Sequence, residues 1–254
     1  MVSTAKPISE SQIAEYEKAG AICLRGLFDE SWVSRLRAAV QRRSEAGPAA
    51  LSRRQAAFSF TELFMARSDP EFREFVFDSP AASIAAQLMR SNSVRFYFDQ
   101  IFNKDPGHLE ISPWHNDQPF YPISGNQVCS VWLALDTVTQ ESSGLQYISG
   151  SHRWEQRPEG DLPNIEEVAA RSDLLCWDME PGDCLVHGGF TVHGASGNTT
   201  SDVRRRALAT RWIGDDVVYR VREKAREELQ VPGLKDGDAL PSGDPFPDVS
   251  VGRA

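Results

Sequence analysis

Histidine is scarce in this sequence, so few residues can serve as nitrogen ligands for a metal. The five histidines are His108, His115, His152, His187 and His193. His115 and Asp117 lie two positions apart in the segment WHNDQPF. If this segment is extended, both side chains leave the same face of a sheet, so an imidazole and a carboxylate can bind one ion. Such a short spacing arises often by chance, and the pair needs a third ligand to be convincing.

His193, in the segment FTVHGASGN, is a candidate for the third ligand. We expect it at the end of a strand that follows the turn EPGD. Two histidines and one carboxylate on one face of an octahedral ion leave three positions open, as in non-haem iron oxygenases, whereas zinc sites are more often tetrahedral. His187 lies six residues earlier and competes for this role.

Three consecutive arginines follow the candidate ligands in the segment RRRALAT. A guanidinium can bind the far carboxylate of a dicarboxylate whose other end chelates a metal. In an extended strand Arg205 shares a face with Ala207 and Ala209, while Arg204 and Arg206 face the other way. Small neighbours leave room for a bound molecule, so the alternation favours Arg205. Arg204 and Arg206 remain alternatives, because a run of arginines is also typical of a solvated surface.

The elements that position these residues fall into two parts. In residues 9–91, a capping box at Ser9 and Gln12 and apolar residues at helical spacing after Asp29 predict a mainly helical segment. Residues 94–218 consist of short runs rich in β-branched and aromatic residues, separated by turn sequences. We expect an antiparallel jelly-roll core with the helices buttressing one face.

Two segments do not fit this core. Residues 153–173 form a long polar insertion between predicted strands, which we interpret as an active-site lid or a surface excursion. Residues 231–254 are rich in proline, glycine and aspartate without periodicity, and we expect an irregular tail. The length of 254 residues is compatible with one domain spanning 1–254.

Composition limits the class of partner. The net charge is -9, from 27 basic and 36 acidic residues, which disfavours a nucleic-acid partner because phosphates require a basic face. No run of apolar residues approaches the length of a membrane span, and no secretory leader is visible. The four cysteines are scattered and are expected to be reduced. We therefore expect a cytoplasmic protein with a small-molecule partner; the oligomeric state is not predicted.

Several motifs occurring in order resemble the phytanoyl-CoA dioxygenase-like family of iron(II)/2-oxoglutarate oxygenases. The likeness extends from about residue 13 to 218 and includes EYEKAGAICLRGLF, FNKDPG, WHNDQPF, VWLALD, SSGLQYISGSH, EPGD, HGASGN and RRRALATRW. It implies a double-stranded β-helix (cupin-like) core with Fe(II) at its mouth, and 2-oxoglutarate and O2 as cosubstrates.

The resemblance also implies roles for individual residues. His115, Asp117 and His193 would be the metal ligands, with His193 preferred over His187. The cosubstrate would be bound by a group of three residues, Arg205, Trp132 and Gln100. Trp132 has the alternative of an ordinary core aromatic, and Gln100 that of a strand residue facing solvent. Some family members have a serine two residues after the second histidine ligand, which is His193 here, and this chain has Ala195 at that position.

The implied activity is hydroxylation of a small organic metabolite with release of succinate and CO2. The carboxylate of Asp117 favours hydroxylation, desaturation or ring chemistry over halogenation, because related halogenases have a small residue at this position. One alternative is a redox-inactive, metal-dependent isomerase or hydrolase on the same cupin-like fold, which would not need an arginine directed at a dicarboxylate. A second is a binding domain without activity, which the intact ligand set disfavours. The primary substrate cannot be predicted, because specificity resides in loops on a shared scaffold.

Overall fold

The computed structural model describes residues 7–46, 59–154, 167, 170, 173–243 and 245–250. The insertion expected at 153–173 lies largely outside the described residues. Among the described helices, none has both the length and the apolar character that a membrane span needs.

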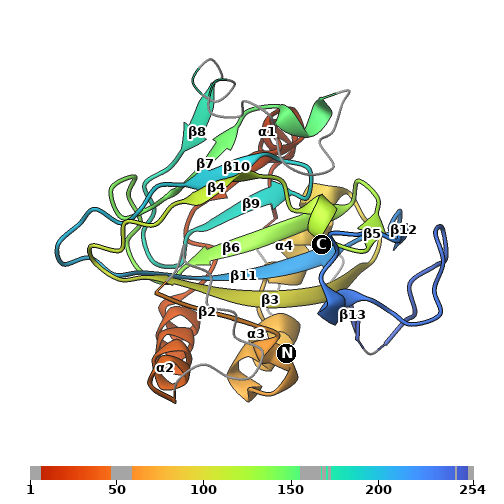
Figure 1. Ribbon diagram of the computed structural model, residues 1–254, viewed down its shortest axis with the longest axis horizontal. Coiled ribbons are helices and arrows are strands. Elements are labelled where there is room, and N and C mark those ends of the chain that lie inside the picture. The colour runs from red at the N-terminus through yellow and green to blue at the C-terminus, as the bar shows by residue number, and fades with distance from the viewer. Residues whose placement is uncertain are drawn as a thin grey trace.

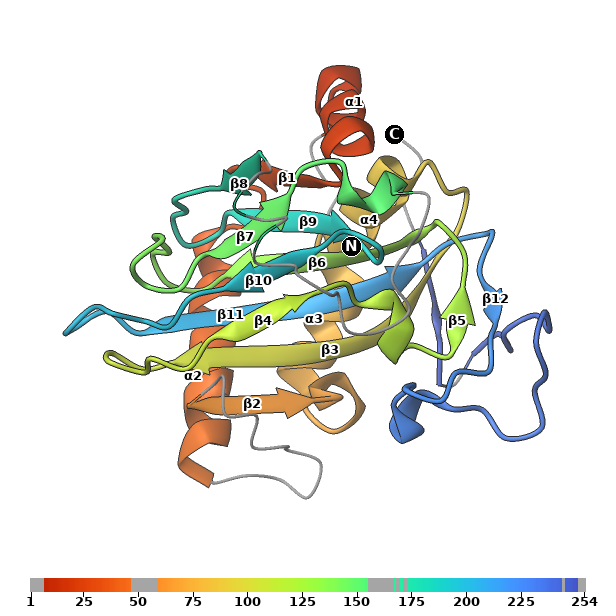
Figure 2. The ribbon, with the colours of Figure 1, turned by 45° about the horizontal axis from the view of Figure 1, so that its top comes forward.

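Two antiparallel sheets lie face to face and form the jelly roll (Figures 1 and 2). The larger sheet has the order β1 (Ala21–Leu24), β9 (Cys184–Gly188), β6 (Val128–Ala134), β11 (Arg205–Ile213), β3 (Val94–Lys104) and β13 (Asp248–Val249), with β2 (Phe60–Leu63) also paired to β3. The smaller sheet has the order β4 (Ser112–His115), β10 (His193–Ala195), β7 (Leu145–Ile148) and β8 (Leu174–Cys176). A separate pair joins β12 (Val218–Tyr219) and β5 (Ile123–Ser124). The mainly β prediction is confirmed.

Helices pack against the outer face of the larger sheet (Figure 1). The α-helices are α1 (Glu10–Ala19), α2 (Glu30–Ala46), α3 (Pro70–Asp78) and α4 (Ala81–Met89). Short 3-10 turns are η1 (Met65–Arg67), η2 (Gln118–Phe120), η3 (Ser151–Arg153) and η4 (Glu227–Leu229). The predicted capping box is present: the side chain of Ser9 accepts a hydrogen bond from the backbone N–H of Gln12, and the side chain of Gln12 accepts one from the backbone N–H of Ser9. Gly20 ends α1 with a φ of 83°, a left-handed conformation that glycine adopts without a steric penalty.

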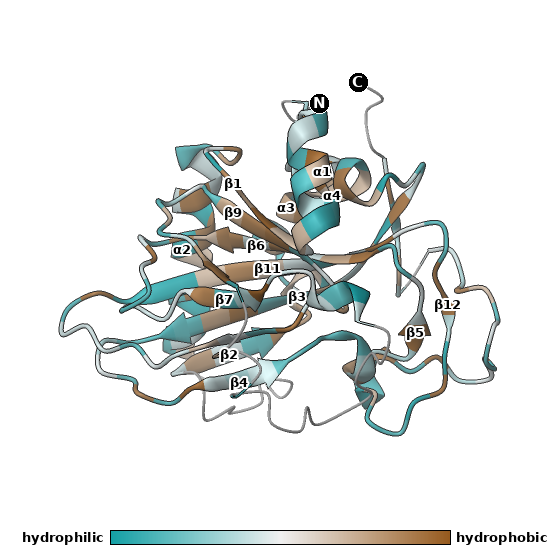
Figure 3. Cartoon of the chain, turned by 90° about the horizontal axis from the view of Figure 1, so that it is seen from above, coloured by the Kyte–Doolittle hydropathy of each residue, from teal (hydrophilic) through white to brown (hydrophobic). Residues whose placement is uncertain are grey.

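Alternation along β11 divides the core into two layers. Leu208 and Trp212 point into the layer between the sheet and the helices. Ala207 and Ala209 point into the layer between the two sheets. The central strands β9 and β6 are largely apolar in Figure 3, whereas many peripheral loops are hydrophilic. Burying each large apolar side chain contributes about 1.5 to 3 kcal/mol, so this two-layer core holds the strands in register.

Two segments differ from the sequence-based expectation. Within the mainly helical part, β2 forms an edge strand on β3, and its buried Glu62 pairs with Arg43 of α2. Four residues are too short to show a period, so only the pairing reveals this strand. In the C-terminal tail, β13 pairs with β3, and Phe246 is buried beside Tyr97. A buried aromatic ring therefore anchors the described part of the tail to the core.

Candidate metal and cosubstrate site

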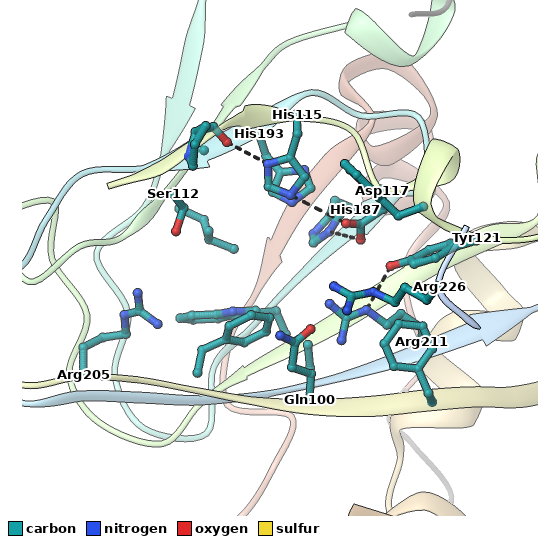
Figure 4. A pocket seen from close by; sticks show the side chains of 18 residues that line it. Gln100, Ser112, His115, Asp117, Tyr121, His187, His193, Arg205, Arg211 and Arg226 are labelled. Atoms are coloured by element: carbon teal, nitrogen blue, oxygen red, sulfur yellow. Dashed lines mark hydrogen bonds and ion pairs between the residues drawn. The ribbon is translucent and has the colours of Figure 1, made fainter. Parts of the chain in front are cut away.

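A cavity of about 260 Å³ lies between the two sheets. Its walls include residues from β4 and β10 of the smaller sheet and from β3, β6 and β11 of the larger sheet. Figure 4 shows the histidines and Asp117 on one side and Arg205 on the other. The site is therefore made by segments that are distant in sequence and meet only in the folded jelly roll.

The three predicted metal ligands lie together. His115, Asp117 and His193 each offer one ligand atom, and these atoms all lie within 4.8 Å of one another. His115 ends β4, but Asp117 does not continue the strand, because its backbone is α-helical (φ -77°, ψ -31°) as the chain enters η2. The prediction that an extended segment directs both side chains to one face is thus wrong in its geometry. The turn still brings Asp117 Oδ1 to 3.7 Å from His115 Nε2.

His193 begins a strand, and the expectation that it ends one is wrong. It is the first residue of β10, and the strand after the EPGD turn is β9, which contains His187. The Cα atoms of His193 and His115 are partners in the β10–β4 pair. Antiparallel pairing of these strands thus brings the two imidazoles together.

Backbone carbonyls orient both ligand imidazoles. His115 Nδ1 lies 2.7 Å from the carbonyl of Pro113, and His193 Nδ1 lies 2.9 Å from that of Thr191. A carbonyl oxygen accepts only, so each Nδ1 carries the proton and each Nε2 retains a lone pair for a metal. Burial lowers the pKa of His193 well below its usual value, which keeps this imidazole neutral.

His187 contacts the carboxylate of the triad. It is buried in β9, and its Nε2 lies 3.7 Å from Asp117 Oδ2. Its Nδ1 lies 3.1 Å from the hydroxyl of Tyr147. Burial opposes ionisation of Asp117, but contacts with His187, His193 and Arg211 outweigh it and hold the pKa of the carboxyl well below its usual range. This position suits His187 to orienting Asp117 and agrees with the preference for His193 as the ligand.

The three arginines point in different directions. Arg205 is 1% exposed and lines the cavity. Arg206 pairs with Asp136, and Arg204 pairs with Asp105 near the surface. The alternation predicted for this strand is therefore present.

Arg205 is suited to a bound carboxylate. Its Nη2 donates to Ser143 Oγ at 3.3 Å, and its Nε has no hydrogen-bond partner among the described residues. Burial lowers its pKa to about 10, so the guanidinium stays charged at neutral pH. A buried cation without a paired anion is costly, and a ligand carboxylate would relieve this cost.

Trp132 and Gln100 both line the cavity, at 2% exposure each. The guanidinium carbon of Arg205 lies 5.6 Å from the ring centroid of Trp132. Trp132 also packs in the core between the sheets, so the two interpretations of this residue hold together. Gln100 Nε2 donates to Thr61 Oγ1 at 3.1 Å, and the alternative that Gln100 faces solvent is wrong.

Other residues of the site were not identified from the sequence. Ser143, which contacts Arg205, has a φ of 74°, unusual for a residue other than glycine. Its Oγ donates to the carbonyl of Ser196 at 2.5 Å, which holds it in place. Arg211 and Arg226 line the cavity as well. The period of two that singles out Arg205 also predicts that Arg211 shares its face. No sequence signal indicates Arg226.

Comparison with known families places this chain. The family model described as Phytanoyl-CoA dioxygenase (PhyH) matches residues 16–207, most of the chain. The protein belongs to the phytanoyl-CoA dioxygenase family, as its motifs predicted.

Two fungal relatives illustrate the sequence likeness. The dioxygenase aneA of Aspergillus aculeatus is 26% identical over 170 residues, which cover 63% of this chain and 54% of that protein. The multifunctional dioxygenase prhA of Penicillium brasilianum is 25% identical over 225 residues, which cover 77% of this chain and 69% of that protein. The match thus spans about half the length of the Aspergillus relative.

Solved structures share the fold. SnoK, described as a non-heme alpha ketoglutarate dependent carbocyclase from nogalamycin biosynthesis, superposes with a TM-score of 0.82 at 24% identity, covering 98% of this chain and all of SnoK. The epimerase SnoN, in complex with Fe3+, alpha ketoglutarate and nogalamycin RO, gives a TM-score of 0.78 at 23% identity, covering 94% of this chain and 97% of SnoN. The likeness confirms the predicted fold class.

Proposed function

We propose that this protein is an iron(II)- and 2-oxoglutarate-dependent dioxygenase that hydroxylates a small organic molecule. The observation that carries the proposal is the placement of His115, Asp117 and His193 on one side of a cavity and of buried Arg205 on the other. Membership of the phytanoyl-CoA dioxygenase family supports it. So does the SnoN complex, whose fold this chain shares and which holds iron and alpha ketoglutarate.

The three predicted metal ligands fit Fe(II). Two neutral imidazoles and one carboxylate suit a non-haem iron that keeps three open positions for other ligands. With Fe(II), 2-oxoglutarate and O2 bound, the site supplies the oxidation in which one oxygen atom enters the substrate C–H bond and the other enters succinate, with loss of CO2.

The side chains of this chain supply orientation. Carbonyls of Pro113 and Thr191 hold the imidazoles. Ser130 Oγ donates to Asp117 Oδ2 at 3.4 Å, and His187 Nε2 lies 3.7 Å from the same oxygen, which leaves Oδ1 directed at the metal position. Arg205 binds the distal carboxylate of 2-oxoglutarate, and Ser143 fixes the angle of its guanidinium.

The cavity walls supply space and exclude water. Ala209, on the same face of β11 as Arg205, leaves room in the cavity, and Trp132 closes the wall with an indole ring. Phe98 and Phe102 line the cavity from β3. Apolar walls strengthen the electrostatic contacts made inside the cavity, because apolar side chains screen charges less than water does.

A redox-inactive isomerase or hydrolase on the same fold is the alternative. A metal-bound water could serve such an enzyme without any second charged group. The buried guanidinium of Arg205 would then have no role that offsets its cost, and this disfavours the alternative.

The test is turnover of 2-oxoglutarate by protein purified without oxygen and loaded with Fe(II). We expect succinate and CO2 to form only when both O2 and Fe(II) are present. Screening metabolite pools for compounds that accelerate this release would then identify the substrate class. Zn(II)-loaded protein is the matched control and should be inactive. Substrate conversion by the Zn(II) form without 2-oxoglutarate would establish the isomerase or hydrolase instead.

A further inference from the structure

The cavity is positively charged although the protein is acidic. Among the described residues that line it, the permanently charged groups are Arg205, Arg211, Arg226 and Asp117. Three guanidiniums against one carboxylate leave two positive charges, in a chain whose net charge is -9. Such a reversal of sign in a partly enclosed site favours an anionic ligand.

The metal and the cosubstrate do not remove this excess, if the proposed function holds. Fe(II) carries two positive charges and the two carboxylates of 2-oxoglutarate carry two negative charges, so the pair is neutral as a unit. Arg205 is then occupied by 2-oxoglutarate, and the charge of Arg211 remains for the third component of the site, which is the primary substrate.

Arg211 lies at a different end of the cavity from Arg205. Both residues face the space between the sheets from β11, but they are six positions apart, which corresponds to about 20 Å along a strand. Figure 4 shows Gln100 between them, with Arg205 on one side and Arg211 on the other. A single 2-oxoglutarate held by Arg205 therefore leaves Arg211 for another group.

The guanidinium of Arg211 is fixed in place and lacks an anion. It is 5% exposed, its Nε donates to the hydroxyl of Tyr121 at 3.1 Å, and it lies 4.5 Å from the ring centroid of Phe98. Its Nη1 has no hydrogen-bond partner in the described part of the chain. No described carboxylate is paired with it, and Asp117, whose pKa it helps to lower, is the proposed metal ligand. A buried charge of this kind is expensive unless a ligand pairs with it.

Arg226 reaches the same end from another element. It precedes η4, and its backbone N–H donates to the carbonyl of Phe120 at 3.1 Å, which ties this segment to the cavity wall. Its side chain lines the cavity, and Figure 4 shows it beside Arg211 and Tyr121. Two guanidiniums from separate elements suit recognition of an oxyanion, because each offers several donors in one plane.

We propose that Arg211 and Arg226 form a subsite for an anionic oxygen group, a carboxylate or a phosphate, on the primary substrate. This subsite rests on the proposed function and specifies its substrate class. It would hold the substrate from the end opposite Arg205 and present the remainder of the molecule to the metal.

The test uses calorimetry on the full chain loaded with Mn(II), which does not start turnover, and saturated with 2-oxoglutarate so that Arg205 is occupied. The probes are inorganic phosphate, butanoate and the uncharged butanamide. We expect at least one anion to bind and butanamide not to bind. Arg211→Gln and Arg226→Gln should each weaken anion binding at least about tenfold, whereas Arg204→Gln, at an exposed arginine, should not. Whichever of phosphate and butanoate binds more tightly identifies the anionic group of the substrate as phosphate or carboxylate.

Three results would overturn the subsite. The first is that the wild-type protein binds neither anion. The second is that Arg204→Gln, Arg211→Gln and Arg226→Gln all bind the anion with equal affinity. The third is that Arg211→Gln loses affinity for 2-oxoglutarate and keeps its affinity for the anion. If Arg211→Gln does not fold, Arg226→Gln at the half-buried position decides. Failure of the wild-type protein to bind Mn(II) or 2-oxoglutarate would instead contradict the proposed function, and the same anion titration on the metal-free protein would still test the subsite.

Discussion

His115 and His193 face each other across the antiparallel pair of β4 and β10, with ring centroids 4.4 Å apart. This relationship fixes two nitrogen ligands on neighbouring strands, and both imidazoles are tied to backbone carbonyls through Nδ1. Ligands fixed in this way lose little further freedom when a metal binds, which favours affinity.

Removal of either imidazole should abolish metal binding. We expect wild-type protein to bind one Fe(II) per chain, and His115→Ala or His193→Ala to bind none, because two ligands cannot complete the facial set. The measurement is iron content after anaerobic loading and desalting.

His187→Ala is the matched control for the metal site. It removes a buried imidazole 3.7 Å from Asp117 without removing a proposed ligand, so most of the iron should remain. Loss of iron in this variant together with normal binding by His193→Ala would reverse the ligand assignment.

Arg205→Ala should raise the 2-oxoglutarate requirement at least about tenfold while Fe(II) binding stays nearly intact. A charged hydrogen bond contributes on the order of 1.5 to 3 kcal/mol, and 1.4 kcal/mol corresponds to a factor of ten. Titration of 2-oxoglutarate against each arginine variant measures the effect. Arg204→Ala and Arg206→Ala should change it little, since these side chains pair with Asp105 and Asp136. A large loss of 2-oxoglutarate affinity in Arg206→Ala alone would show that the assignment is off by one residue.

Ser143→Ala should have a smaller effect in the same assay. The variant removes one hydrogen bond to the guanidinium of Arg205, worth about 0.5 to 1.5 kcal/mol, so the 2-oxoglutarate requirement should rise by about two- to tenfold. Ser196→Ala serves as the comparison, because it keeps the backbone carbonyl that Ser143 contacts. Equal behaviour of the two variants would argue that Ser143 does not position Arg205.

Asp99→Asn should stabilise the protein more as the pH rises. Burial raises the pKa of Asp99 from 3.8 to about 7, against the opposing effect of the hydrogen bond from Ala66. Between about pH 4 and 7 the folded chain therefore retains a proton that the unfolded chain has lost, and its stability falls with rising pH. Asparagine has no such charge, and each pKa unit corresponds to about 1.4 kcal/mol.

Urea unfolding at pH 4.5 and pH 8 measures this effect. The stability gained by Asp99→Asn should be larger at pH 8 by an amount on the order of a few kcal/mol. The exposed Asp202→Asn is the control and should show no such trend. A gain that is the same at both pH values would contradict the buried, protonated state of Asp99.

Local pattern was sufficient to predict several features. The capping box at Ser9 and the alternation of Arg205 with Ala207 depend on neighbours a few residues apart, and both are present in the structure. The order of the motifs around His115, Asp117 and His193 was likewise sufficient to predict the family and the candidate metal ligands. The sequence by itself thus determined the fold class and the chemical types at the site.

Only the tertiary structure decided how these groups face one another. Asp117 reaches His115 through a turn and not along a strand, and His187 approaches Asp117 from β9 of the larger sheet. Arg226 joins Arg211 at one end of the cavity although no period links the two residues. Such relationships depend on strand pairing and on packing between the sheets, which bring distant segments together, and no local spacing encodes them.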